Sequence, residues 1–236
     1  MKLVIFDLDG TLTKTFAIDE QCFVQAFADA LGINAVNRNW SEYEHVTDSG
    51  VLQEVFRKSL GRAPEASEVS AFVQCFVGSL NHHYCKSIDD FGDVPGAASM
   101  LITLKENCEW GAAIATGSWE RSARFKMKSA GIDADPLPAA FAEDGPSQES
   151  IVQAAIARAS VFYRQSAFEK VVSVGDAMWD LWTARRLGLP FVGVAHEERA
   201  RNLRGLGASH VIENFLDCEH WLQCLEGAAV PDAEAS

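Results

Sequence analysis

Six short apolar segments are the feature that most constrains the fold of this sequence. In the second half of the chain, helical patterns separate them. They span residues 2–6, 111–115, 137–141, 170–174, 191–194 and 210–212. Apolar runs of this length are typical of strands buried on both faces of a parallel sheet. Residues 95–107, 147–160 and 180–187 carry apolar residues at helical spacing between the later segments. The alternation predicts an α/β fold, a Rossmann-like doubly wound parallel sheet with helices on both faces.

A long stretch with little strand character interrupts this alternation after the first segment. Within residues 15–88, three ranges have helical patterns: 19–31, 50–60 and 68–84. We therefore expect an inserted all-helical domain at 15–88 and an α/β core domain formed by 1–14 and 89–225. The small, acidic residues of 226–236 predict a disordered tail.

The charge balance excludes several classes of partner. The chain has 33 acidic and 20 basic residues and a net charge of −13. This balance argues against a nucleic-acid partner, because phosphate contacts need clustered Lys and Arg. The same balance argues against an anionic membrane surface, and no segment reaches the ~20 apolar residues of a spanning helix. The first apolar run is too short for a secretory signal and is interrupted by Asp7. We expect a cytoplasmic protein, monomeric or homodimeric, with no nucleic-acid or membrane partner.

The six cysteines form no CxxC pair and are expected to be reduced.

Polar side chains follow three of the predicted strands at the points where the strands end. Ligands of open α/β sheets bind at this edge. Carboxylates without Cys or His suit Mg²⁺, while hydroxyls before a helix suit a phosphate. The carboxylates are Asp7, Asp9, Asp176 and Asp180, and the segment before a helix is Thr116, Gly117 and Ser118.

Asp7 and Asp9 stand one residue apart and would repel each other. At ~4 Å and an effective dielectric of ~20, two like charges oppose each other by about 4 kcal/mol. A positive group between them, or a proton on one of them, is therefore required.

These three motifs together resemble the haloacid dehalogenase-like hydrolase superfamily over nearly the whole chain. The motifs are "DLDGTLT" at 7–13, "ATGS" at 115–118 and "GDAMWD" at 175–180. The stretch 94–105 is similar to the branch that holds phosphoglycolate phosphatases and β-phosphoglucomutases. In that branch the helical insertion is a cap domain over the active site.

The resemblance implies an Mg²⁺-dependent phosphatase acting on a small phosphorylated metabolite. Asp7 would be the nucleophile that forms an aspartyl-phosphate, and Asp9 the general acid and base. The second Asp, at position 9, separates phosphatases from the dehalogenases of the superfamily. Mg²⁺ would be held by the Asp7 carboxylate, the Asp9 backbone carbonyl and Asp176, with Asp180 supporting the ion from behind its ligands.

The remaining motif residues would bind the phosphate. Gly10 would let the backbone turn tightly beside it. The hydroxyl of Thr116 and the amides of Gly117 and Ser118 would meet the phosphoryl oxygens.

One family motif is missing. The superfamily places a Lys before the helix that follows the third strand, and Gly145 stands in its place here. Because the transferred phosphoryl group needs a cation, we expect Arg121, in the first turn of the helix after Thr116, to fill the role in part.

Two alternatives to a phosphatase remain open. A phosphomutase of the β-phosphoglucomutase type would need a basic residue just after residue 118, where Trp119 and Glu120 stand. A weakly catalytic phospho-ligand-binding protein is supported only by the missing Lys. In the cap, residues 44–50 are either a substrate-contacting loop or an ordinary turn between helices.

Overall fold

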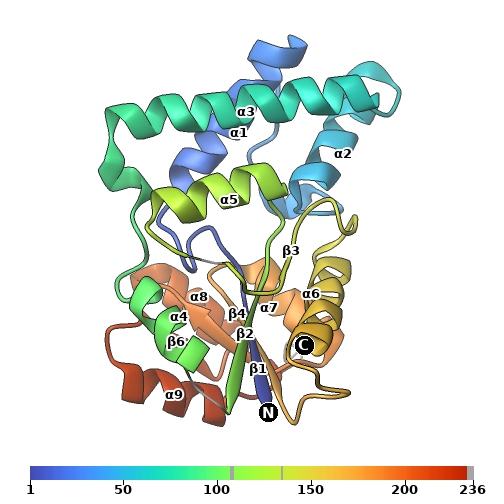
Figure 1. Cartoon of the computed structure of the whole chain (residues 1–236). Helices are drawn as coiled ribbons and strands as arrows, with labels where there is room; N and C mark the ends of the chain where they lie inside the picture. Colours follow the sequence, from blue (N-terminus) through green and yellow to red (C-terminus); the bar gives the residue numbers. More distant parts are fainter. Residues whose placement is uncertain (107–108, 134, 233–236) are drawn as a thin grey trace.

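The computed structural model describes residues 1–106, 109–133 and 135–232, in which a parallel sheet lies below a layer of helices (Figure 1). The sheet has the strand order β3-β2-β1-β4-β5-β6. Its strands are β1 (Lys2–Phe6), β2 (Trp110–Ala115), β3 (Ala139–Ala140), β4 (Val171–Gly175), β5 (Phe191–Val194) and β6 (His210–Ile212). The order confirms the predicted doubly wound α/β sheet.

Strand β1 lies at the centre of the sheet, and its register positions the site. Phe6 pairs with Ile114 of β2 on one side and with Val174 of β4 on the other. The carboxyl ends of β1, β2 and β4 are therefore immediate neighbours. Asp7, Thr116 and Asp176 follow these three ends, at the point where the chain switches from one side of β1 to the other.

Alternate side chains of β1 fill two separate cores, as the two-residue period of a strand requires. Val4 and Phe6 pack beneath three helices on one face, whereas Leu3 and Ile5 pack on the other. The first face is covered by α4 (Ala97–Glu106), α5 (Glu120–Ser129) and α9 (Cys218–Gly227). The second is covered by α6 (Gln148–Phe162), α7 (Met178–Leu187) and α8 (Glu197–Gly205).

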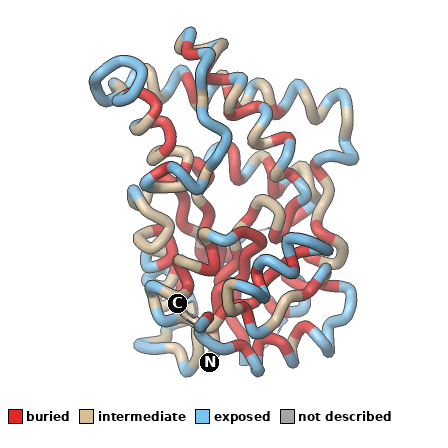
Figure 2. The backbone as a smooth tube through the Cα atoms, turned by 180° about the vertical axis from the view of Figure 1, so that it is seen from behind, coloured by how far each residue is buried: buried red, intermediate tan, exposed pale blue. Residues whose placement is uncertain are grey.

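The layer above the carboxyl ends has a core of its own, visible in Figure 2 as a second region of buried chain. Phe23, Phe27, Phe72 and Phe76 form its centre through edge-to-face ring contacts. The layer contains α1 (Phe16–Leu31), η1 (Trp40–Glu42), α2 (Asp48–Leu60), α3 (Ala66–Lys86) and η2 (Ile88–Phe91). We call it the cap; the exact division of the chain at residues 14 and 89 stays a prediction.

The elements expected from the sequence are present, with shifts at their ends. The strand expected at 137–141 is reduced to two residues, because Pro138 has no N–H to donate to a neighbouring strand. Helix α1 begins at Phe16, three residues before its expected start, and Asn107, the last residue of an expected helix, lies outside the described residues.

The described part of the tail differs from the predicted disorder. Residues 226 and 227 complete α9, and Ala228 and Pro231 are buried. The Phe191 N–H donates to the Ala229 carbonyl at 3.0 Å, which attaches the tail beside β5. Residues 233–236 lie outside the described residues.

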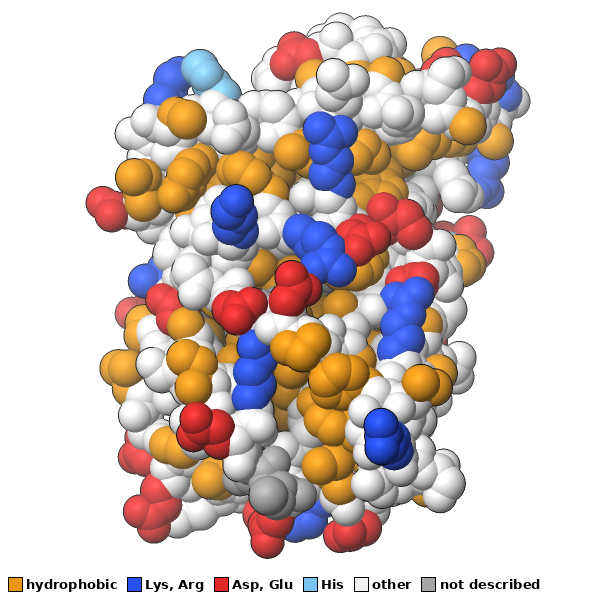
Figure 3. All heavy atoms as spheres, viewed as in Figure 1, with side chains coloured by type: hydrophobic (Ala, Val, Ile, Leu, Met, Phe, Trp, Pro, Cys, Tyr) orange, Lys and Arg blue, Asp and Glu red, His pale blue; other side chains and the backbone are white. Residues whose placement is uncertain are grey.

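The surface in Figure 3 mixes both charges, with Lys and Arg side chains lying among Asp and Glu side chains. Ion pairs of the described residues include Arg158 with Asp144 at 2.6 Å and Arg124 with Glu120 at 2.8 Å. Among the described residues, no helix combines the length and the apolar character needed to span a membrane. The five described cysteines have free thiols, and Cys108 lies outside the described residues.

Candidate active site

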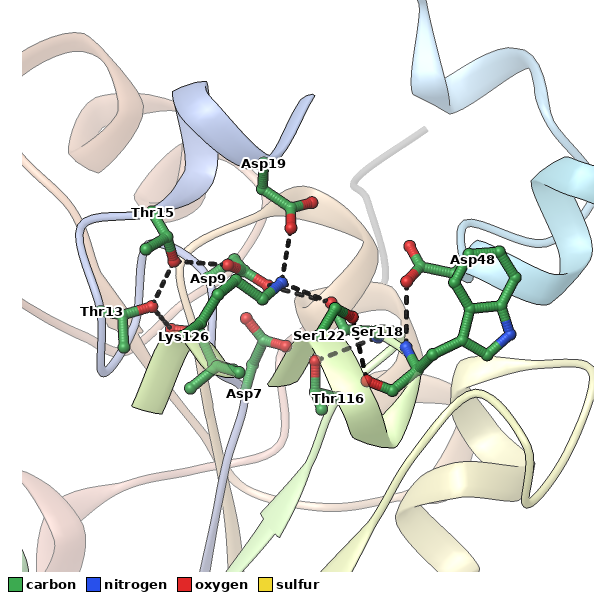
Figure 4. A network of polar contacts seen from close by, with 12 residues as sticks. Asp7, Asp9, Thr13, Thr15, Asp19, Asp48, Thr116, Ser118, Ser122 and Lys126 are labelled. Atoms are coloured by element: carbon green, nitrogen blue, oxygen red, sulfur yellow. Dashed lines mark hydrogen bonds and ion pairs between the residues drawn. The ribbon is translucent and has the colours of Figure 1, made fainter. Parts of the chain in front are cut away.

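A cavity of about 640 Å³, counting the part open to solvent, lies between the carboxyl ends of the strands and the cap. Its core-side lining contains most of the residues that the sequence singled out, several of which are drawn in Figure 4. These residues are Asp7, Asp9, Thr116, Gly117, Ser118 and Asp176, with Gln148 and Trp179 beside them. The sequence-predicted residues from three separate strand ends thus meet in one cavity.

Three carboxylates form a compact group beside this cavity. One oxygen from each of Asp7, Asp176 and Asp180 lies within 4.8 Å of the others. Gly10 makes this approach possible: its φ of 86° is left-handed, and a Cβ atom there would overlap the Asp176 carboxylate. Asp180 accepts a hydrogen bond from the Ala177 N–H at 3.0 Å, which fixes it in the first turn of α7.

The charges of this group are poorly compensated by the protein. Burial, followed by the repulsion of Asp180, Asp176 and Asp9, raises the pKa of Asp7 well above its ordinary value. Burial raises the pKa of Asp176 to about 7 and that of Asp180 to about 8, although Arg199 donates to Asp176 at 2.6 Å. Clustered carboxylates that burial and mutual repulsion push toward their neutral form fit a hard divalent ion such as Mg²⁺, which would stabilise their charged form.

The Asp9 side chain is held by a different set of donors. Its Oδ1 accepts from the Thr15 hydroxyl at 2.5 Å, and its Oδ2 accepts from Ser118 Oγ at 3.1 Å and Lys126 Nζ at 2.5 Å. Two hydroxyls and an ammonium therefore fix the orientation of this carboxyl group. The two neighbouring Asp residues have different environments, Asp7 among carboxylates and Asp9 beside a cation.

Lys126 supplies the positive charge for Asp9, one member of the Asp pair. It is fully buried on α5, and its ammonium contacts Asp9, Asp19 at 2.6 Å and Ser118 at 2.8 Å (Figure 4). Burial alone lowers the pKa of a lysine, but the carboxylates of Asp19, Asp9 and Asp48 outweigh it, and the net pKa is raised. The lysine is therefore charged at neutral pH.

Lys126 was not predicted from the sequence, because the family pattern places the cation in the loop after the third strand. The signal was present in the helical period: Ser122, Ala123, Lys126 and Met127 form the buried face of α5. Helical side chains lean toward the N-terminus of their helix, which brings the Lys126 ammonium toward Ser118. Arg121 is exposed and does not line the cavity, so the structure does not place it in the expected role.

The structure leaves no room for a side chain at Gly145, the position where the family has a lysine. A Cβ atom on Gly145 would overlap the Ser150 side chain, and Gly145 does not line the cavity. Gln148, the first residue of α6, does line it, with its amide nitrogen 3.4 Å from the Val46 carbonyl.

The segment before α5 is arranged as a turn at the cavity wall. The Ser118 N–H donates to Thr116 Oγ1 at 3.2 Å, and the Gly117 carbonyl accepts from the Asp48 N–H at 2.8 Å. The next two amides are already taken, since Trp119 donates to Asp48 and Glu120 donates to Glu143. Phosphate binding by the first amides of α5 itself is therefore not supported.

The loop of residues 44–50 connects the cap to the core. Thr47 Oγ1 donates to the Pro146 carbonyl at 3.1 Å, and Ser49 Oγ donates to the Ala142 carbonyl at 3.1 Å. Val46, Thr47 and Asp48 line the cavity, whereas His45 and Ser49 do not. The loop therefore joins the cap to the core by hydrogen bonds and also forms part of the cavity wall.

Comparison with known proteins places this geometry in a family. Residues 1–188 match the haloacid dehalogenase-like hydrolases. A phosphoglycolate phosphatase from Rhodospirillum rubrum is 26% identical over 239 residues, covering 94% of this chain and 90% of that protein.

Solved structures share the fold. A hydrolase from Pseudomonas syringae superposes with a TM-score of 0.69 at 23% identity, covering 94% of this chain and 98% of that one. CbbY from Rhodobacter sphaeroides, in complex with xylulose 1,5-bisphosphate, superposes with a TM-score of 0.66 at 17% identity, covering 91% and 95%. The family match spans most of the chain and confirms the resemblance read from the sequence: this protein belongs to the haloacid dehalogenase-like hydrolases.

Proposed function

We propose that this chain is an Mg²⁺-dependent phosphatase that hydrolyses a small phosphorylated metabolite through an aspartyl-phosphate on Asp7. One observation carries the proposal: a single cavity brings together Asp7, beside two further carboxylates, and Asp9, held by Lys126. The name of the Rhodospirillum rubrum relative supports the same reaction type.

Asp7 acts as the nucleophile. Its carboxylate oxygen forms a bond to phosphorus while the bond from phosphorus to the ester oxygen breaks, which leaves an acyl phosphate on the enzyme. Asp7 follows the central strand directly, so the sheet fixes its position against the substrate.

Asp9 moves the protons. It gives its proton to the departing ester oxygen and then takes one from the water that hydrolyses the acyl phosphate. The hydroxyls of Thr15 and Ser118 can donate or accept, and they hold the carboxyl group in place in both of its protonation states.

Lys126, rather than the expected Arg121, supplies positive charge at the site. It acts through its contacts with Asp9 and Ser118, which line the cavity, because it does not line the cavity itself. The phosphoryl group carries negative charge as it is transferred, and the buried ammonium beside Asp9 and Ser118 opposes that charge. With Lys126 in this place, the weakly catalytic alternative loses its only argument.

Asp7 and Asp176 would hold Mg²⁺ together with the Asp9 backbone carbonyl, and Asp180 would support these ligands. When bound, Mg²⁺ neutralises phosphoryl charge and orients the phosphate. The close approach of three carboxylates, whose charge Arg199 compensates only in part, is the structural reason for the assignment.

The phosphomutase alternative lacks a group for a second phosphate. Trp119, at the place where a basic residue is expected, is buried and packs among the cap aromatics Phe23, Phe72 and Phe76. The described residues that line the cavity include no Lys, Arg or His.

Phosphate release from p-nitrophenyl phosphate with Mg²⁺ tests the proposal. Asp7→Asn should lower kcat by about 10²–10⁴-fold or more, because an amide is a poor nucleophile and a weak ligand. The matched control Asp90→Asn changes an exposed residue of η2 and should keep full activity. Retention of more than about a tenth of the activity by a folded Asp7→Asn protein, against that expected loss, would contradict the covalent mechanism.

A further inference from the structure

The cap side of the cavity combines aromatic walls with carboxylates. Phe16 and Trp40 from the cap line it together with Trp179 from α7, and the rings of Phe16 and Trp179 stack at 6.5 Å between centroids. The carboxylates on this side are those of Asp19, Glu20 and Asp48. A substrate bound here therefore meets flat apolar surfaces and negative charge.

The cations near the cap side of the cavity already form ion pairs with carboxylates of the protein. Lys126 contacts both Asp9 and Asp19. Arg199 pairs with Asp176, and its guanidinium lies 5.0 Å from the centroid of the Phe16 ring. Neither residue lines the cavity, whose described lining contains no Lys, Arg or His.

Glu20 and Asp48 each receive a neutral donor. Trp40 Nε1 donates to Glu20 Oε2 at 3.2 Å, and the Trp119 N–H donates to Asp48 Oδ2 at 2.9 Å. Within the described residues, the second oxygen of each carboxylate has no hydrogen-bond donor within range. Burial, with the repulsion of Asp19, raises the pKa of Asp48 well above its ordinary value. A cation in the cavity would stabilise both charged carboxylates.

We propose that the substrate is the phosphomonoester of an amine-bearing alcohol, whose ammonium group is recognised by Glu20 and Asp48 against the aromatic walls. This inference rests on the proposed phosphatase function and names its substrate class. An ammonium group gains from carboxylates and from the faces of aromatic rings alike. A carboxylate or a second phosphate on the leaving group would face charge of its own sign.

The inference separates this chain from the substrate named for its Rhodospirillum rubrum relative. Phosphoglycolate carries a carboxylate on its leaving group, and the cavity offers that carboxylate no cationic partner among the described lining residues.

The test compares three phosphomonoesters of similar size: 2-aminoethyl phosphate, 2-hydroxyethyl phosphate and phosphoglycolate. We expect kcat/KM to fall in that order, with the amine exceeding the carboxylate by about 10²-fold, as for a charge reversed near partly buried carboxylates. Where turnover is too slow to follow, the inhibition constant against p-nitrophenyl phosphate takes its place.

Two variants locate the source of the preference. Glu20→Gln and Asp48→Asn keep an oxygen that can accept from Trp40 and from the Trp119 N–H, but remove the charge. Each should lower the amine-to-carboxylate ratio by about tenfold, the effect of weakening one charge-assisted contact. The matched control Glu44→Gln removes an exposed charge outside the cavity and should leave that ratio unchanged.

The outcomes distinguish this inference from the function on which it rests. If p-nitrophenyl phosphate is hydrolysed but phosphoglycolate or 2-hydroxyethyl phosphate equals the amine, the substrate class is wrong and the phosphatase stands. An unchanged ratio in both variants also overturns the assignment of Glu20 and Asp48. If p-nitrophenyl phosphate itself is not hydrolysed, the proposed function is the one that fails.

Discussion

At the scale of single residues, the position of Lys126, the one buried Lys or Arg side chain among the described residues, determines the charge balance of the site. Lys126 contacts Asp9 and Asp19 and is itself fully buried, so its removal would leave two carboxylates without their partner. Arg121 lies on the same helix but is exposed. We therefore expect replacement of Lys126 to lower the activity and replacement of Arg121 to leave it unchanged.

Lys126→Met should lower kcat on p-nitrophenyl phosphate by about 10²–10³-fold, the loss typical of one group that stabilises transition-state charge. It should also lower the free energy of unfolding by about 3–5 kcal/mol, because breaking a buried ion pair leaves an uncompensated charge. Arg121→Ala and the exposed control Lys128→Met should retain wild-type kcat.

A second variant separates a catalytic from a structural loss. In Asp19→Asn/Lys126→Met one of the orphaned charges is removed as well, so part of the stability should return, as measured by urea unfolding, while kcat stays low. A double variant with restored kcat would show that Lys126 only maintains the fold.

At the scale of elements, the loop before α2 and the start of α5 join the cap to the core. Trp119 packs its ring into the cap aromatics, while its Nε1 donates to Ser49 Oγ at 2.9 Å. Its backbone N–H donates to Asp48. One residue of the core domain thus contacts both the core of the cap and the wall of the cavity.

Trp119→Phe should keep the ring packing and remove the side-chain donor. We expect a loss of about 1 kcal/mol in unfolding free energy, the net worth of one hydrogen bond, and a higher KM because the cap is held less firmly. Ser49→Ala removes the same bond from the other side. A double-mutant cycle should therefore show a coupling energy of about 0.5–1.5 kcal/mol, and strict additivity would contradict the contact.

The elements themselves were largely predictable, but the side chains that complete the site were less so. The apolar segments from 2–6 to 210–212 predicted the sheet because central parallel strands must be apolar on both faces. Asp7, Asp9 and Asp176 could be placed at one edge because parallel strands end together. Lys126 was not recognised, since its neighbours in space, Asp9 and Asp19, come from distant parts of the sequence.

The cap residues that line the cavity together could not be predicted from the sequence either. Glu20 and Trp40 lie on separate elements, and only the packing of α1 against the segment before α2 brings their side chains together at 3.2 Å. Helical periodicity shows which face of α1 is buried, but it does not show which residues of another element meet that face.

At the scale of the whole molecule, the buried carboxylates couple stability to pH and to metal. Asp176 and Asp180 have pKa values of about 7 and about 8 in the folded protein, against an ordinary value of 3.8. The folded state therefore binds more protons than the unfolded state between these limits. By linkage, the free energy of unfolding must fall as the pH rises through this window.

Urea unfolding in a chelator should show this directly, with the unfolding midpoint decreasing from about pH 5 to about pH 8, the window set by the ordinary and shifted pKa values. Addition of Mg²⁺ should raise the midpoint most at the alkaline end, where the carboxylates are charged and the ion binds only the folded state. Asp180→Asn removes one raised pKa and should flatten the profile measured in chelator. A midpoint that rises with pH in chelator would show that this carboxylate group does not titrate in this window. A Mg²⁺ effect as large at pH 5 as at pH 8 would show that binding of the ion does not depend on the charge of these carboxylates.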